Sequence, residues 1–198
     1  MGYDRVGVQA LLEPLDNAVD AAGKRIAQVP ADSPDYADAV TDEECDRIEE
    51  FLGVAFIACQ VHLKSILSAA RALNRYYESR SGSKLTSVAP LRMMKHGLEP
   101  LVGGYTSVEV INAAANYYKH RDEWRLPWKK LGKRQRETVA IIEACGAQSG
   151  STGNMRALAR VLGNKGFNRS AKYGDLLEVW AEALVTSYRE ELSRSGEL

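Results

Sequence analysis

The stretch IEEFLGVAFIACQVHLKSILSAARAL, residues 48–73, carries its apolar residues at the spacing of a helix that packs against another helix. A seven-residue repeat within it is formed by Leu52, Cys59, Ile66 and Leu73. Such a repeat aligns apolar side chains along one face and makes a seam for a neighbouring helix. We therefore expect one long helix over residues 41–80, which is typical of a helical bundle.

The chain before this helix predicts a second long helix that runs antiparallel to it. Residues 4–28 carry apolar side chains at three- and four-residue spacing, and Pro14 among them predicts a kink or a break. Residues 30–40 contain two prolines and are predicted to be a linker. Glu44 follows Thr41 by three residues, the capping-box pattern that marks the start of a helix.

The chain after the long helix also has a helical pattern. A third helix is expected over residues 106–124, where Thr106 and Glu109 form a second capping box. Shorter helices are expected at residues 134–145, 154–162 and 172–194. We find no run of alternating apolar and polar residues, so no sheet is expected. The sequence predicts a single all-α domain, with a core bundle over residues 1–130 and C-terminal helices packed on it over residues 131–198.

Composition narrows the class of protein. The chain has 198 residues, 26 basic and 26 acidic side chains, and 45% hydrophobic residues, as in globular proteins. No apolar run reaches the length of a membrane span and no signal peptide is visible, so we expect no membrane partner. Three widely spaced cysteines without a CxxC pair favour a reducing, cytoplasmic setting. Metal-ligand motifs and a P-loop are missing, so neither a metal nor a cofactor is expected.

The balanced net charge hides two oppositely charged segments. Residues 31–50 hold nine acidic residues and one basic residue, and residues 114–136 hold eight basic and two acidic residues. The segments are interpreted either as solvated surfaces that attract each other within or between chains, or as a sign of a basic face for a phosphate-bearing partner. The carboxylate pairs Glu43–Glu44 and Glu49–Glu50 are interpreted as facing solvent. The candidate nucleic-acid-binding residues are Lys119, Arg121, Arg125, Lys129, Lys130, Lys133 and Arg134.

Aromatic residues interleave with this basic run at Tyr117, Tyr118, Trp124 and Trp128. Stacking on bases together with neutralisation of phosphates uses such a mixture of side chains. The alternative interpretation is that Trp124 and Trp128 are buried while the basic heads stay in solvent.

The third helix carries a polar stripe. At three- and four-residue spacing it consists of Glu109, Asn112, Asn116, His120 and Glu123. Asparagine is a poor helix-interior residue, so two of them one turn apart indicate buried polar contacts. Asn116 and His120 can reach the same small volume and are the candidate catalytic residues. The alternative for His120 is a hydrogen-bonded structural residue beside Asn116.

Residues 115–120, ANYYKH, resemble the signature of the HEPN superfamily (higher eukaryotes and prokaryotes nucleotide-binding). The resemblance implies an α-helical bundle, often dimeric, from a toxin–antitoxin, abortive-infection or other antiviral system. Its nuclease members pair an Arg with a His and cleave RNA without metal. Asn116 and His120 match the polar and His positions of the signature, but Ala115 stands where the family has its Arg.

The sequence therefore predicts a HEPN-like bacterial protein, catalytically degenerate, that binds nucleic acid or a protein partner, where the protein partner is either another protein or a second copy of the chain in a homodimer. One alternative is a metal-independent endoribonuclease that uses His120. A second is an oligomeric scaffold whose acidic and basic surfaces mate. A DNA-reading helix-turn-helix at residues 154–173 is also considered, although Arg169 stands where such motifs bury an apolar residue.

Overall fold

The protein is an all-α helical bundle. The computed structural model describes residues 5–30, 34–82, 90–124 and 127–194. Within these ranges the chain forms seven α-helices, one 3-10 helix and no strand. The elements are α1 (Arg5–Ala27), α2 (Pro34–Ser81), α3 (Pro90–Met94), α4 (Ser107–His120), η1 (Trp128–Lys130), α5 (Lys133–Ala144), α6 (Asn154–Val161) and α7 (Ala171–Arg194). The predicted fold class is confirmed.

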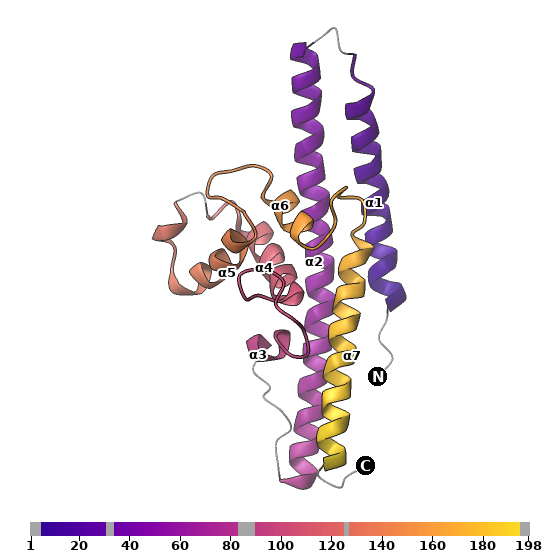
Figure 1. Ribbon diagram of the computed structural model, residues 1–198, viewed down its shortest axis with the longest axis vertical. Coiled ribbons are helices and arrows are strands. Elements are labelled where there is room, and N and C mark those ends of the chain that lie inside the picture. The colour runs from indigo at the N-terminus through magenta and orange to yellow at the C-terminus, as the bar shows by residue number, and fades with distance from the viewer. Residues whose placement is uncertain (1–4, 31–33, 83–89, 125–126, 195–198) are drawn as a thin grey trace.

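The 48-residue helix α2 is the spine of the molecule (Figure 1). At 1.5 Å per residue it is about 70 Å long. Helix α1 lies antiparallel to it along its upper part, while α7 runs in the same direction as α2 along its lower part and contacts α1 as well. The helices α4, α5 and α6 form a lobe on one side of this stack. At the upper end, α1 and α2 extend together beyond the other helices as an arm.

The heptad seam of α2 forms the centre of the core. Leu52, Cys59 and Ile66 are buried, and Leu73 is partly buried against them. The ring of Phe56 stacks on Tyr173 of α7, with centroids 4.8 Å apart. With 24 residues, α7 is about as long as α1 and supplies large core side chains, so of the three predicted C-terminal helices only α5 and α6 are short.

The start of α2 differs from the prediction. The helix begins at Pro34, so residues 34–40 of the predicted linker are helical, while residues 31–33 lie outside the described residues. Proline is well tolerated in the first turn because the N–H it lacks has no helical partner there. Thr41 and Glu44 are consequently interior residues and form no capping box. The other predicted interruption, at Pro14, does not break α1, which is continuous through it.

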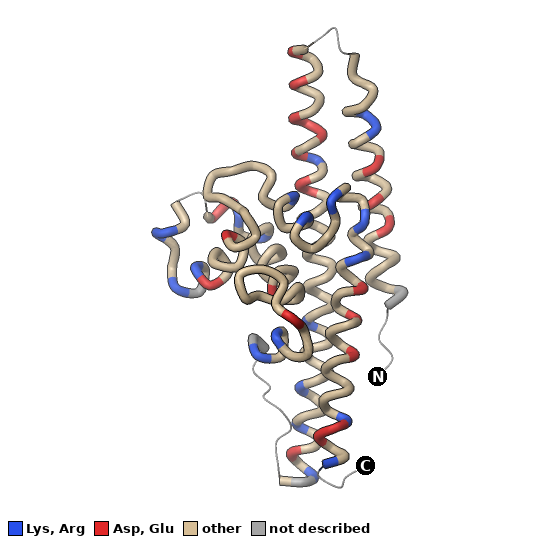
Figure 2. Tube along the Cα trace, in the orientation of Figure 1, with Lys and Arg blue, Asp and Glu red and all other residues tan. Residues whose placement is uncertain are grey.

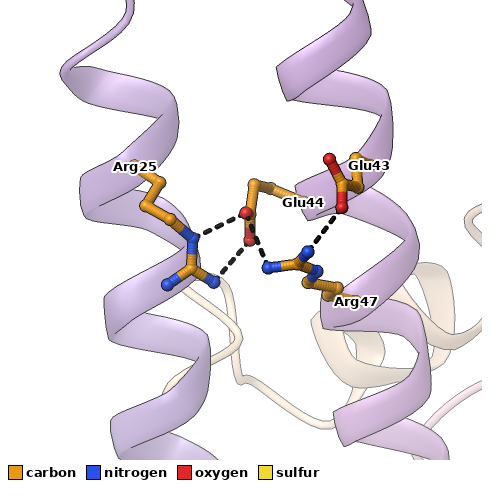
Figure 3. Close-up of polar contacts among 4 residues, drawn as sticks. All are labelled: Arg25, Glu43, Glu44 and Arg47. Atoms are coloured by element: carbon orange, nitrogen blue, oxygen red, sulfur yellow. Dashed lines mark hydrogen bonds and ion pairs between the residues drawn. The ribbon is translucent and has the colours of Figure 1, made fainter.

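Glu44 instead joins the two helices of the arm (Figure 3). Its buried carboxylate accepts two hydrogen bonds of 2.6 Å from the Nε and Nη2 atoms of Arg25 in α1. Arg47 donates a third at 3.1 Å and also pairs with Glu43. These bonds, the one from Arg25 first, hold the pKa of Glu44 below its usual value. Burial of this carboxylate is tolerated because each oxygen faces a guanidinium group.

Carboxylates of α1 and α2 also accept hydrogen bonds from the first turns of the C-terminal helices α6 and α7. Glu49 of α2 accepts hydrogen bonds from the backbone N–H groups of Met155 and Arg156, at 2.8 and 3.0 Å, in the first turn of α6. Asp16 of α1 likewise accepts a bond of 2.7 Å from the N–H of Ser170 at the start of α7. The interpretation of the carboxylate pairs as solvent-facing is therefore wrong for Glu44 and for Glu49, which are both buried.

Residues 162–170 separate α6 from α7. A helix-turn-helix joins its helices by a turn of only about three to four residues. The helix-turn-helix interpretation is therefore wrong. The connection is instead ordered by buried Asn164, whose Nδ2 donates to the Tyr173 hydroxyl at 3.0 Å.

One segment of α2 is apolar enough to cross a membrane by length and composition alone. It is an 18-residue window with a mean hydropathy of 1.5. The sequence, in contrast, predicts that no apolar stretch is long enough to span a membrane. Half of the window is buried inside the protein, as in the core helix of a bundle.

Candidate functional site

The helix that carries the polar stripe begins as predicted. Thr106 is the N-cap of α4, and the Glu109 carboxylate accepts a 2.9 Å hydrogen bond from the Thr106 N–H in return. The helix ends at His120, four residues before the predicted end. Residues 121–124 form turns in which the N–H groups of Glu123 and Trp124 donate to the His120 carbonyl. These turns bring Glu123 and Trp124 back beside the His120 ring.

A polar pocket of about 350 Å³ lies at this end of α4, and we call it the His120 pocket. It is lined by Asn116, His120, Glu123, Trp124, Gln135 and Thr138. The expectation that Asn116 and His120 reach the same small volume is confirmed. Gln135 and Thr138 come from α5 and were not predicted, since nothing in the sequence shows which face of α5 meets α4.

His120 is held by two neighbours on its own turn. Its Nδ1 lies 3.0 Å from the Glu123 carboxylate, and its ring lies nearly parallel to Trp124, with centroids 6.3 Å apart. The side chain is 46% exposed, so His120 is hydrogen-bonded but is not a core residue. A carboxylate at Nδ1 favours the tautomer with its proton on that atom, which leaves Nε2 as an acceptor.

Behind the pocket, the asparagines of the stripe meet Gln60 of α2. Its buried amide nitrogen donates to the side-chain oxygens of Asn112 and Asn116, at 2.8 and 2.9 Å. Its oxygen accepts a 2.6 Å bond from Lys119. Desolvation, followed by repulsion from Lys64, lowers the pKa of Lys119. The asparagines thus make the predicted polar contacts, which are partly buried, and Lys119, although exposed, is paired within the chain.

Arg121 also has a partner within the chain. Its Nη2 lies 2.6 Å from the Glu50 carboxylate, and its guanidinium lies over the Tyr118 ring, 4.4 Å from the centroid. The Tyr118 hydroxyl donates to the other Glu50 oxygen at 2.6 Å. Burial, then this bond, raises the pKa of Tyr118 to about 12. The acidic and basic segments thus meet at Glu50 within one chain.

The remaining predicted cations are differently placed. Lys129 and Lys130 on η1 and Lys133 on α5 are exposed and make no ion pair with any described residue. Figure 2 shows basic residues gathered in the lobe that holds these elements. Arg125 lies outside the described residues, and the side chain of Arg134 is likewise not described.

The aromatic rings near the basic run belong to the core. Trp124 and Trp128 are each 4% exposed, and both rings pack against Tyr117, with centroids 5.9 and 5.8 Å away. The interpretation that these tryptophans are buried is confirmed. The indole N–H of Trp124 is buried and has no acceptor among the described residues.

Positive charge from Lys or Arg is missing from the described lining of the His120 pocket, which does contain the Glu123 carboxylate. Ala115, at the position of the family's Arg, is fully buried, and no described Lys or Arg side chain lines the pocket. No group of three His, Cys, Asp or Glu side chains that could hold a metal ion is found in the described part of the chain.

Compared with protein-family models, with curated proteins and with solved structures, the chain matches none. Its function must therefore be inferred from the pocket and from the signature at residues 115–120.

Proposed function

We propose that the protein binds single-stranded RNA and holds one nucleotide in the His120 pocket. The observation that carries this proposal is the pocket itself, a polar volume of about 350 Å³ next in the chain to the exposed lysines of η1. Its size lies in the range of small-molecule sites, roughly 300–1,000 Å³. Bases of unpaired RNA are recognised in such hollows by stacking and by hydrogen bonds to their edges.

The lining supplies both kinds of contact. The half-exposed imidazole of His120, backed by Trp124, offers a flat surface for stacking. The side chains of Asn116, Gln135 and Thr138 offer donors and acceptors for a base edge. Lys129 and Lys130 are unpaired within the described residues and are available to neutralise phosphates.

Binding is favoured over cleavage because the described lining of the His120 pocket holds no Lys or Arg side chain. Cleavage without metal requires a cation close to the phosphorane, because negative charge develops on its oxygens. No described Lys or Arg side chain lines the pocket, and Arg121 is paired with Glu50. The HEPN resemblance adds the setting, a dimeric protein of a bacterial defence or toxin–antitoxin system in the cytoplasm.

One observation favours the second candidate, a metal-independent endoribonuclease. The 3.0 Å contact between His120 and Glu123 is the arrangement that fixes an imidazole as a general base. In this reaction Nε2 of His120 would take the proton from the RNA 2′-hydroxyl.

The two candidates are separated by one set of measurements. We expect fluorescently labelled single-stranded RNA in EDTA to bind with an affinity that falls as salt is added. Replacing both lysines, K129Q/K130Q, reduces the slope of log affinity against log salt by about 1.4, since each phosphate contact contributes about 0.7. The variant K24Q/K165Q removes two exposed lysines elsewhere and is the matched control.

The same samples report cleavage. Fragments ending in 2′,3′-cyclic phosphate, formed by the wild type and lost in His120→Ala, establish the ribonuclease. Intact RNA, with weaker binding by His120→Ala, supports the binding function. An affinity that is the same at low and high salt contradicts both candidates, because each requires contacts to phosphates.

A further inference from the structure

A second pocket lies on the other side of α5. It has a volume of about 670 Å³ and is lined by Arg92, Lys95, Tyr105, Glu109, Lys133, Arg136, Glu137, Ala140 and Ile141. Five of these residues belong to α5. They begin at Lys133 and follow it at three, four, seven and eight positions, a spacing that places all five on one face of the helix. Gln135 and Thr138 of the His120 pocket lie on the opposite face. The two pockets are therefore separate, and we call this one the α3–α5 pocket.

Positive charge converges on the α3–α5 pocket from two directions. Arg92 comes from α3, while Lys133 and Arg136 come from α5. All three are exposed and pair with no carboxylate among the described residues. Lys95 is the exception, at 3.6 Å from the buried carboxylate of Glu109. Four cations face two carboxylates in the lining, which leaves a surplus of two positive charges.

The same pocket has an apolar side. Tyr105 and Ile141 are partly buried and pack on the core, and Ala140 beside them is small and exposed. The turn that carries Tyr105 is held by two backbone hydrogen bonds to Val102 and one of 2.7 Å from Leu101. A flat apolar group can therefore lie on this surface with little rearrangement of the chain.

We propose that the α3–α5 pocket binds a small aromatic phosphate monoester. A monoester carries nearly two negative charges near neutral pH, which matches the surplus of the lining, whereas a diester carries one. Arginines from two elements can each donate a fork of hydrogen bonds to the phosphate oxygens. The aromatic body lies against Tyr105, Ala140 and Ile141. This ligand is distinct from the RNA of the His120 pocket, whose internal phosphates are diesters.

Titration calorimetry with four probes tests this assignment on the full chain. Phenyl phosphate combines the two features, inorganic phosphate and benzyl alcohol carry one each, and methyl phenyl phosphate is the diester. We expect phenyl phosphate to bind about tenfold or more tightly than each of the others. Inorganic phosphate binding as tightly as phenyl phosphate overturns the proposal, and so does a lack of phenyl phosphate binding to the wild type.

Two variants place the ligand. R92Q/R136Q weakens phenyl phosphate binding by about tenfold or more, while K24Q/K165Q, with the same change in net charge, binds as the wild type does. Ala140→Trp fills the apolar surface without changing charge and blocks phenyl phosphate but not RNA. Circular dichroism confirms that each variant folds. Equal binding by R92Q/R136Q and K24Q/K165Q contradicts the assignment.

Discussion

At the scale of single residues, Gln60 does most to position the candidate site. Its amide nitrogen donates a hydrogen bond to the side-chain oxygen of Asn116, and Asn116 lines the His120 pocket. The sequence shows a polar residue between the buried Cys59 and Leu63, but not its partners, which are more than fifty residues away. The stripe on α4 could be predicted because it is local. The residue that completes it could not, because it comes from another helix.

We predict that Gln60→Leu lowers the free energy of unfolding by about 1–3 kcal/mol, although the new side chain is apolar. The reason is that Asn112, Asn116 and Lys119 each lose a partly buried hydrogen bond. Urea denaturation measures the change, and Ser65→Leu on the exposed face of α2 is the control. The prediction is contradicted if Gln60→Leu proves as stable as the control.

At the scale of elements, α2 and α4 meet at a glycine. A Cβ atom at Gly53 of α2 would lie 2.1 Å from the ring of Tyr118, so only glycine allows this ring to lie against the helix. The same ring carries the contacts to Glu50 and Arg121. Gly53 thus sets how closely the two helices approach.

Gly53→Ala is expected to destabilise the protein by about 1–3 kcal/mol through overpacking, despite the better helix propensity of alanine. In contrast, Gly23→Ala in α1, where a Cβ meets nothing within 4 Å, is expected to stabilise by about 0.5–1 kcal/mol. Thermal unfolding of the two variants gives opposite shifts in Tm. A rise in Tm for Gly53→Ala shows that Tyr118 moves away at little cost.

Helix boundaries show what local sequence signals can and cannot predict. Thr106 and Glu109 form the predicted capping box, because the chain before Thr106 is not helical. Thr41 and Glu44 have the same spacing, yet helix α2 already runs through them from Pro34. There, the pairing of Glu44 with Arg25 of α1 takes the carboxylate away from a local cap. The periodicity of the seam predicts that α2 exists, while its first turns depend on α1.

At the scale of the whole molecule, the all-α architecture could be predicted from periodicity, but the arm could not. Its two helices extend beyond the lobe and pack mainly on each other (Figure 1).

The buried carboxylate that joins these two helices makes the stability of the arm depend on pH. The pKa of Glu44 is lowered, chiefly by the hydrogen bonds from Arg25. Such a carboxylate stabilises the fold above its unfolded-state pKa, near the usual value of 4.5, and loses this effect as pH falls through the lowered folded-state pKa.

We therefore predict that Glu44→Gln lowers Tm at about pH 7, and that its difference from the wild type shrinks as the pH falls from 4.5 through the lowered folded-state pKa. Below the folded-state pKa both proteins carry a neutral side chain at this position. Thermal unfolding across this range measures the difference, and Glu43→Gln, at the exposed neighbour, is expected to change Tm less. A difference that stays constant with pH would show that Glu44 acts through packing and not through its charge.

The caps supplied by Asp16 and Glu49 also bear on how the protein is made. A ribosome releases α1 and α2 first, and both carboxylates belong to these helices. Forming the first turn is the unfavourable step in making a helix. The first turns of α6 and α7 are synthesised after the Glu49 and Asp16 carboxylates that accept their N–H hydrogen bonds. Assembly can therefore follow the order of synthesis, with the N-terminal pair acting as the template on which the C-terminal helices start.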